Sequence, residues 1–351
     1  MEADLLKAML RDMLLARVFE ERAAQEYAEG NIAGFLHLYP GEEAVAVGVL
    51  HASEPSDYVV STYREHVHAL VRGISAKAVM AELFGKRSGC SRGMGGSMHL
   101  FDRERRFMGG YAIVGETFPV AIGIAYAVAL RELPEVVICF FGDGAVNQGT
   151  FHESLNMAAL WNLPVLFVCE NNRYQIGTEI HRHSAVTEVY KRACAYHIPS
   201  KRVDGMDVSA VYEASQEVLE QIRNGNGPQL LECETYRFRG HSMADPGNYR
   251  PQVEVQWFEA NEDPLKIAIA ETVTSYPDEV QMAAVGDDNI ERLQRDLHQG
   301  GILTMQQLEG LKREVAEEVE EAVRFATESP DPSWEDAWAA LNCNRHDEEL
   351  I

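Results

Sequence analysis

The sequence predicts an α/β protein with a doubly wound parallel sheet and helices on both faces, preceded by N-terminal helices and followed by a C-terminal helical segment. Two observations support this prediction. Residues 136–141 and 163–169 are short, continuous apolar runs, which are typical of strands buried on both faces of a parallel sheet. Residues 150–161 between them have helical spacing, and strand–helix–strand units with short joints form right-handed parallel crossovers.

The elements before the first buried strand are mostly helical. Residues 1–30 place apolar side chains on one stripe of a helix. The elements that follow are expected to be a helix over 41–51, a strand over 58–62, a helix over 76–85 and a glycine-dense loop over 85–96.

The second half of the chain changes character near residue 250. A helix near 208–222 and a strand over 230–238 complete the α/β part. Residues 305–327 predict an acidic amphipathic helix with one apolar face. We divide the chain into an N-terminal helical segment (1–57), an α/β core (58–250) and a C-terminal helical region (251–351) that packs on the core and on a partner.

Composition and charge exclude several classes of protein. The chain has 351 residues and is 46% hydrophobic, which is typical of a globular protein. Its net charge of −24 disfavours a generic nucleic-acid binder and a protein adsorbed to anionic membrane, because both need a basic face. No apolar run approaches the ~20 residues of a membrane span. Residues 1–21 lack a signal-peptide core. Cys139, Cys169 and Cys233 lie in apolar runs and are expected to be buried thiols.

The strongest chemical signal is a pair of polar motifs at the ends of the two apolar runs. Gly142-Asp143-Gly144 follows the first run, and Asn171-Asn172 follows the second after 26 intervening residues. If the two strands are neighbours, the carboxylate and the amide meet at the carboxyl edge of the sheet, where ligands of open α/β sheets bind. Hard oxygen ligands suit Mg²⁺, and the glycines let a diphosphate approach the backbone. An Asp-Gly pair alone indicates only a turn.

A nicotinamide- or flavin-dinucleotide enzyme is disfavoured, because Gly142-Asp143-Gly144 lacks the third glycine of the dinucleotide fingerprint.

The spacing of the two motifs resembles the signature of thiamine-diphosphate enzymes, and the flanking residues resemble the alpha subunits of the decarboxylating component of pyruvate dehydrogenase, in particular the cyanobacterial and plastid branch. The resemblance covers nearly the whole chain. The segments that carry it are His37–Ala44, Thr62–His66, Arg92–His99, Asn156–Trp161, Glu170–Tyr174, Val203–Asp207 and Tyr236–Ser242.

The resemblance implies a role for particular residues. Asp143 and Asn172 ligate Mg²⁺ through their side chains and Tyr174 through its carbonyl. The residues that meet the diphosphate are Gly144, Ala145, Tyr63, Arg64 and His241, while Ala112 and Val114 lie in the turn that holds the aminopyrimidine ring. His37 and His241 are the catalytic candidates, although the residues alone leave His37 open as a core histidine. The family has glycine at the position of Ala112, which matters only if φ there is positive.

Residues 240–250 form a polar loop that, in this family, is mobile over the cofactor entrance. Ser242 matches a position that is phosphorylated in some members. The alternative interpretation is that Ser242 only makes hydrogen bonds within the loop. A phosphate there would place like charge beside His241 and the diphosphate.

The resemblance also implies partners. The carboxylate that activates thiamine comes from a separate beta subunit in this family, so we expect an α2β2 heterotetramer with the cofactor at the α/β interface. The implied reaction is oxidative decarboxylation of pyruvate with transfer of the acetyl group to the lipoyl group of the acyltransferase component, which gives acetyl-CoA in the full complex.

Three alternatives remain. A branched-chain 2-oxo acid or an acetoin dehydrogenase alpha subunit differs in substrate, but the loop over 242–247 resembles the pyruvate type. A non-catalytic scaffold has no physical need for Asp143, Asn172, Arg64 and His241 together. A bacterial cytoplasm is the expected location, with the plastid stroma as the alternative.

Overall fold

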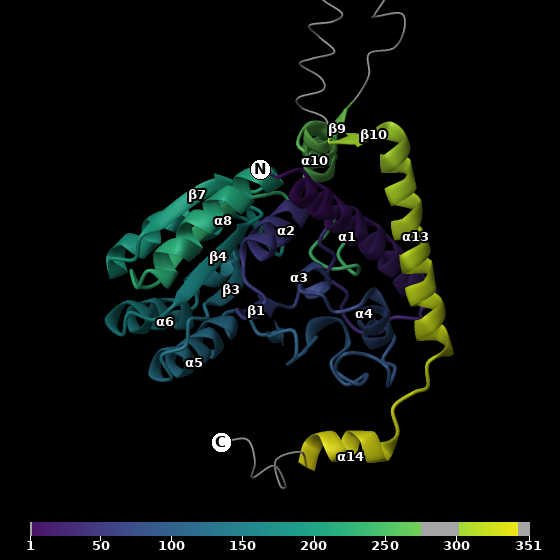
Figure 1. Ribbon diagram of the computed structural model, residues 1–351, viewed down its shortest axis with the longest axis horizontal. Coiled ribbons are helices and arrows are strands. Elements are labelled where there is room, and N and C mark those ends of the chain that lie inside the picture. The colour runs from purple at the N-terminus through teal and green to yellow at the C-terminus, as the bar shows by residue number, and fades with distance from the viewer. Residues whose placement is uncertain (1, 275–301, 343–351) are drawn as a thin grey trace, which may run out of the picture.

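A six-stranded parallel sheet forms the centre of the computed structural model, which describes residues 2–274 and 302–342 (Figure 1). The strand order is β2-β1-β3-β4-β8-β7. The strands are β1 (Tyr58–Thr62), β2 (Phe107–Tyr111), β3 (Val137–Gly142), β4 (Val165–Asn171), β7 (Ser200–Asp204) and β8 (Gln229–Glu234). Every neighbouring pair in this sheet runs parallel, which confirms the predicted fold class.

The two faces of the sheet bury alternate residues of the same strands. On β3, Ile138 and Phe140 join one apolar cluster, whereas Val137 and Phe141 join another. Because successive side chains of a strand point to opposite faces, the two clusters lie on opposite faces of the sheet. The helices whose residues enter the first cluster include α1 (Ala3–Glu29), α2 (Glu43–Ala52), α4 (Ala76–Leu83) and α8 (Val208–Arg223). The second cluster is covered by α5 (Thr117–Leu130) and α6 (Gly149–Leu160).

β3 and β4 are direct neighbours, as the site prediction required, with Gly142 paired to Glu170. The predicted strand over 230–238 is too long, because β8 ends at Glu234. Tyr236 and Phe238 remain buried without sheet pairing, in a separate cluster where the Tyr236 ring stacks on Phe258 with centroids 3.9 Å apart. Their apolar character therefore reflects packing against a helix rather than a strand.

Two strands of the main sheet and one helix that covers it were among the elements not predicted from the sequence. β2 contains Gly109 and Gly110, which weaken a strand signal. β7 is a polar edge strand, so its sequence does not alternate clearly. α5 is apolar throughout and has Pro119 in its first turn, where a missing N–H costs no helical hydrogen bond.

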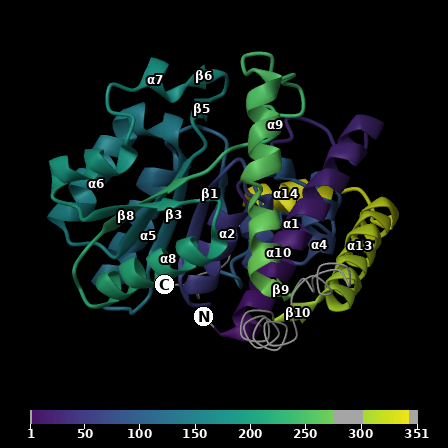
Figure 2. The ribbon, with the colours of Figure 1, turned by 90° about the horizontal axis from the view of Figure 1, so that it is seen from above.

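The C-terminal region is mostly helical, and two of its helices pack on α1. It contains α9 (Gln252–Asn261), α10 (Pro264–Thr272), the two-stranded pair β9 (Val273–Thr274) and β10 (Leu303–Thr304), α13 (Met305–Glu328) and α14 (Trp334–Asn342). α13 confirms the predicted acidic helix; it begins with a capping box between Thr304 and Gln307 and packs on α1 and α4. Figure 2 shows α10 lying beside α1. The division of the chain at residues 57 and 250 stays a prediction.

Short elements connect the main layers. They are α3 (His66–Val71), α7 (Ile180–His183), the antiparallel pair β5 (Tyr174–Gln175) and β6 (Thr178–Glu179), and the 3₁₀ turns η1 (Gly96–Met98), η2 (Asp143–Asn147) and η3 (Val189–Tyr196). Cys139, Cys169 and Cys233 are buried free thiols, as predicted, and Cys343 lies outside the described residues. In the described ranges no helix is long and apolar enough to cross a membrane.

Candidate active site

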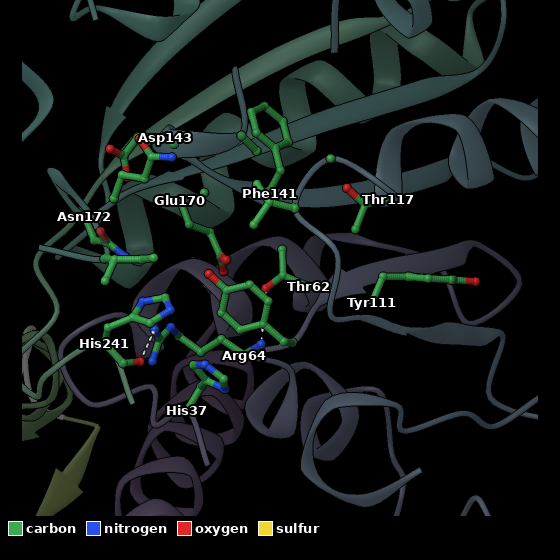
Figure 3. Close-up of a pocket in the computed structure, with 18 of the residues that line it drawn as sticks. His37, Thr62, Arg64, Tyr111, Thr117, Phe141, Asp143, Glu170, Asn172 and His241 are labelled. Carbon is green, nitrogen blue, oxygen red and sulfur yellow. Dashed lines mark hydrogen bonds between the residues drawn. The ribbon is translucent and has the colours of Figure 1, made fainter. Parts of the chain in front are cut away.

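A cavity of about 300 Å³ lies at the carboxyl ends of the central strands (Figure 3). Its lining comes from the ends of β1, β3 and β4, from the loop after β2 and from segments near residues 37–42 and 237–241. The predicted residues that line it are His37, Tyr63, Arg64, Ala112, Val114, Asp143, Gly144, Ala145, Asn172, Tyr174 and His241. The fold thus brings together every predicted cofactor, metal and catalytic residue, drawn from positions 37 to 241.

Asp143 and Asn172 form what we call the strand-end wall of the cavity, together with the glycines Gly142 and Gly144. Asp143 begins the 3₁₀ turn η2 directly after β3, and Asn172 directly follows β4. Both side chains are buried. Figure 3 shows them at the same end of the pocket. Their position follows from the sheet, because the carboxyl ends of neighbouring parallel strands meet at one edge.

Each of these two polar side chains has a fixed partner. The Asn172 amide nitrogen Nδ2 donates to Glu42 Oε1 at 2.9 Å, and Asn172 Oδ1 accepts from the Tyr174 backbone N–H at 3.3 Å. Since a backbone N–H can only donate, the Tyr174 contact identifies Oδ1, and Glu42 accepts from the opposite side of the amide, so the two contacts together set which way the Asn172 amide faces. On the other side, Asp143 Oδ2 lies 3.2 Å from Nε2 of His183.

The glycines of the strand-end wall leave room for a ligand. A Cβ added at Gly142 would meet no atom within 4 Å, although Gly142 lines the cavity, so the backbone is open to the cavity there. A Cβ at Gly144 would come within 2.5 Å of the Gln175 side chain. Ala112 has no positive φ, so its departure from the family's glycine causes no backbone strain.

Three aromatic rings form what we call the ring wall of the cavity: His37, Tyr63 and His241. The His37 ring lies 4.4 Å from the Tyr63 ring and 5.0 Å from the His241 ring, measured between centroids. Arg64 joins the segments that carry the histidines, since its guanidinium donates to the carbonyl oxygens of Leu38 and His241. Within the ring wall, Tyr63 directly follows β1, whereas both histidines come from loops.

Both histidines of the ring wall are neutral near pH 7. Burial, together with the charge of Arg64, lowers the pKa of His37 to about 2 and that of His241 to about 3. The Nδ1 atoms of His37 and His241 are buried and have no hydrogen-bond partner among the described residues. A neutral imidazole offers one donor and one acceptor, so these rings can bind a polar ligand without a charge.

Two buried glutamates next to the cavity were not identified as site residues from the sequence. Burial raises the pKa of Glu42 to about 7, and the nearby Glu170 adds to this increase while Arg64 opposes it. Glu170 accepts hydrogen bonds from the Tyr39 hydroxyl and from His68 Nε2. Glu42 lies at the start of the predicted helix over 41–51, and an acidic residue beside Pro-Gly in an otherwise apolar stretch is a signal that could have identified it.

Arg237 and Arg250 organise the loop that follows β8 and were also missed. Arg237 lines the cavity and donates to the Ile176 carbonyl and the Tyr249 hydroxyl. Arg250 is buried; its guanidinium donates to the carbonyls of residues 237–239 and lies 5.2–5.7 Å from the centroids of the Tyr174, Tyr236 and Tyr249 rings. These contacts tie both ends of the loop to the wall of the cavity.

Ser242 lies apart from the other predicted residues. It lines a second cavity of about 390 Å³ between the loop over 240–250 and α9, and its backbone oxygen accepts from the Asp245 N–H. It directly follows His241, whose backbone N–H donates to Asp245 Oδ2 at 2.6 Å. A change at Ser242 would therefore act on the ring wall through this loop.

The residues present fit a divalent cation with a diphosphate and an organic ring. Asp143, Asn172 and the Tyr174 carbonyl offer the hard oxygens that Mg²⁺ prefers. Among the described residues there is no group of three or more His, Cys, Asp or Glu side chains that could hold a metal by themselves. Phosphate and water oxygens would therefore have to complete the shell, as is usual for Mg²⁺. Glu42 and Thr117 also line the cavity, and Glu42 Oε2 and Thr117 Oγ1 accept no hydrogen bond in the described part of the chain, although Glu42 Oε2 lies 3.7 Å from Arg64 Nε.

Comparison with known proteins shows the family to which this chain belongs. The family described as "Dehydrogenase E1 component" matches residues 11–275. The chain is 43% identical over 335 residues to the pyruvate dehydrogenase E1 component subunit alpha of Porphyra purpurea, covering 93% of this chain and 90% of the relative. It is 45% identical over 329 residues to the protein of that name from Rhizobium meliloti (strain 1021), covering 94% and 87%. It is 43% identical over 330 residues to the chloroplastic subunit alpha-3 of Arabidopsis thaliana, covering 92% and 71%. The chain belongs to the dehydrogenase E1 component family.

Proposed function

We propose that this chain is the alpha subunit of a pyruvate dehydrogenase and that its main cavity binds Mg²⁺ and thiamine diphosphate. The observation that carries the proposal is the strand-end wall, where a carboxylate and an amide follow two neighbouring parallel strands beside a glycine turn. The relatives named as pyruvate dehydrogenase alpha subunits, each matched over more than nine-tenths of this chain, support the choice of reaction.

The cofactor would be held by residues of both walls. Asp143, Asn172 and the Tyr174 carbonyl would ligate Mg²⁺. Gly144, Ala145, Tyr63, Arg64 and His241 would face the diphosphate, and the backbone of Ala112 and Val114 would face the aminopyrimidine ring. When bound, thiamine diphosphate supplies the electron sink for decarboxylation of a 2-oxo acid.

The protein's own contribution is binding and orientation. Asp143 and Arg64 supply opposite charges on either side of the cavity, so an anionic ligand with its cation is neutralised locally in a chain with a net charge of −24. His37 and His241, which are neutral near pH 7, can each donate one hydrogen bond and accept another through their ring nitrogens.

A beta subunit is expected to complete the site. Thiamine chemistry needs a carboxylate at the aminopyrimidine ring, and Ala112 and Val114, the residues proposed to face that ring, carry none. The rim of the cavity exposes apolar side chains, since Ile113 and Ile176 are 70% and 60% exposed. An α2β2 heterotetramer would cover this rim, and the lipoyl group of the acyltransferase component would then receive the acetyl group.

Ser242 is proposed as a phosphorylation site only where a kinase is present. A phosphate on Ser242 would place negative charge next to His241 and disturb the loop that Asp245 holds. Full activity and unchanged cofactor affinity in Ser242→Glu would contradict this regulatory role.

A bacterial cytoplasm is the proposed location, and the plastid stroma is the alternative. The relatives include a protein from Rhizobium meliloti and a chloroplastic protein from Arabidopsis thaliana, so they support both.

The function is tested by 2-oxo acid decarboxylation with an artificial electron acceptor. The full chain is purified with its partner from the native extract and supplied with Mg²⁺ and thiamine diphosphate. Pyruvate, 2-oxoisovalerate and 2-oxoglutarate are compared as substrates. We expect turnover of pyruvate and a second polypeptide that co-purifies.

Two other outcomes would contradict the proposal and indicate a different function. Turnover of 2-oxoisovalerate instead of pyruvate identifies a branched-chain enzyme. Absence of both turnover and cofactor binding, with the partner present, favours the non-catalytic scaffold.

A further inference from the structure

Asp143 contacts a histidine that belongs to none of the sequence motifs discussed above. His183 is the last residue of α7, and its Nε2 lies 3.2 Å from Asp143 Oδ2. The side chains of His183 and Asp143 are 7% and 2% exposed. We propose that His183 is a positioning residue for the metal site: it holds Oδ2 of Asp143 and so leaves Oδ1 for the cation. This inference rests on the proposed function.

The hydrogen bonds behind His183 have a fixed direction. Asn147 Oδ1 accepts from Arg192 Nη1 at 3.1 Å, and Asn147 Nδ2 donates to the His183 carbonyl at 3.1 Å. A guanidinium can only donate and a carbonyl can only accept, so these two contacts fix the orientation of the Asn147 amide. Asn147 Nδ2 therefore faces Nδ1 of His183, which is 3.3 Å away.

This direction determines the tautomer of His183. Because Asn147 Nδ2 is a donor, Nδ1 of His183 acts as the acceptor, and the Ser184 hydroxyl at 3.0 Å can donate to the same atom. The proton of the neutral imidazole is then on Nε2, where it is donated to Asp143. The chain of contacts runs from Arg192 through Asn147 and His183 to the carboxylate, and it needs no protonated imidazole.

The chain segment that follows β4 carries this histidine together with two candidate ligands. This segment begins with Asn172 and Tyr174, reverses direction at the β5–β6 hairpin and ends with α7 at His183. The Ile180 N–H donates to the Arg173 carbonyl at 2.9 Å, and this bond joins the start of α7 to the start of the segment. The spacing between the ligands and their positioning residue is thus set within one short segment.

The held carboxylate is expected to bind a cation more tightly than a free one. Oδ1 of Asp143 makes no hydrogen bond to the described residues, so only Oδ2 is engaged before a cation binds. Hydrogen-bond partners of metal ligands typically contribute ~10–100-fold to metal affinity. Loss of the Nε2 donor should therefore weaken cation binding by about that factor without altering the sheet that carries Asp143.

The test measures Mn²⁺ binding in the presence of thiamine diphosphate, by titration calorimetry on the full chain in complex with its beta subunit. His183→Phe removes the donor and keeps a planar ring, and His183→Gln places an amide donor near the position of Nε2. His181→Phe is the matched control, since His181 is exposed on the same helix. We expect His183→Phe to raise the Mn²⁺ Kd by ~10–100-fold, His183→Gln to recover most of the affinity, and His181→Phe to change nothing.

Two further variants separate the possible failures. Asn147→Ala removes an exposed member of the chain of contacts and should weaken Mn²⁺ binding in the same direction, by less; it also replaces His183→Phe if that variant does not fold. Asp143→Ala tests the metal site itself. Loss of Mn²⁺ binding in Asp143→Ala with unchanged binding in His183→Phe, or a loss that His183→Gln does not relieve, overturns the positioning role alone. Unchanged binding in Asp143→Ala overturns the proposed metal site.

Discussion

The two walls of the cavity are built differently. The strand-end wall is fixed by the sheet, and its polar side chains already have partners: Asp143 contacts His183, and Asn172 donates to Glu42. The histidines of the ring wall come from loops, and Nδ1 of both His37 and His241 is buried without a hydrogen-bond partner among the described residues.

This difference indicates that the two walls have different roles in cofactor binding. Buried polar groups are normally hydrogen-bonded, so an unpartnered one indicates a ligand or partner that supplies the bond. The strand-end wall is set before the cofactor arrives, whereas the ring wall is completed by what binds there. Changes to the first wall should therefore alter cofactor affinity, and changes to the second should alter loop order and pH response.

Removing the charge of Asp143 should have the largest effect. Asp143→Asn keeps an oxygen that can accept from His183 but removes the negative charge that attracts Mg²⁺. We expect cofactor affinity to fall by more than the ~10–100-fold that an outer hydrogen-bond partner contributes, with little change in the unfolding midpoint. Fluorescence titration with thiamine diphosphate and thermal unfolding measure the two quantities.

Glu153→Gln serves as the control for that experiment, because Glu153 is exposed on α6. Cofactor affinity equal to that of the wild type in Asp143→Asn contradicts the metal assignment.

Glu42 should come second, since it orients Asn172 from behind. Glu42→Ala removes the acceptor for Asn172 Nδ2 and leaves only the Tyr174 N–H to orient the amide, so cofactor Kd should rise by ~10–100-fold. Glu42→Gln keeps an oxygen acceptor and resembles the protonated acid, so it should lie close to the wild type. The same titration compares the two variants, and equal losses in both would show that charge rather than orientation is required.

Arg250 should have a smaller effect, confined to the loop. Arg250→Lys cannot donate to all three carbonyls of residues 237–239, so local opening should become easier by ~1.5–3 kcal/mol, which is typical of hydrogen bonds from a charged group. Limited proteolysis should then cut faster within 240–250. Arg239→Lys is the control, because Arg239 is exposed. Equal cleavage rates in both variants would be inconsistent with an anchoring role for Arg250.

The pH response of the ring wall should give the smallest change. The folded-state pKa of His37 is about 2, below its ordinary value of 6.5, so the folded chain binds fewer protons between these values. The stability that His37 contributes is present above pH 6.5 and is lost as the pH falls below it. His37→Asn should therefore make stability fall less steeply between pH 7 and pH 5 in urea unfolding, and His181→Asn should not. An unchanged slope would mean that His37 is not held neutral.

The sequence predicted the strand-end wall better than anything else. Apolar runs mark β3 and β4, and the polar residues that follow such strands necessarily lie at one edge of the sheet. Glu42 and His183 could not be found in this way, because their contacts with Asn172 and Asp143 join positions 130 and 40 residues apart. β7 was missed because a polar edge strand lacks the buried pattern, and Tyr236 and Phe238 were assigned to a strand because burial in any setting selects apolar residues.

The most direct test of the account is anomalous diffraction from crystals of the assembled protein grown with Mn²⁺ and thiamine diphosphate. The account predicts one Mn²⁺ peak in the main cavity, within ligand distance of the Asp143 carboxylate, the Asn172 amide oxygen and the Tyr174 carbonyl, with the diphosphate beside Gly144. A peak held by other residues, or a cavity that contains the cofactor with no Mn²⁺ at the ends of β3 and β4, would contradict it.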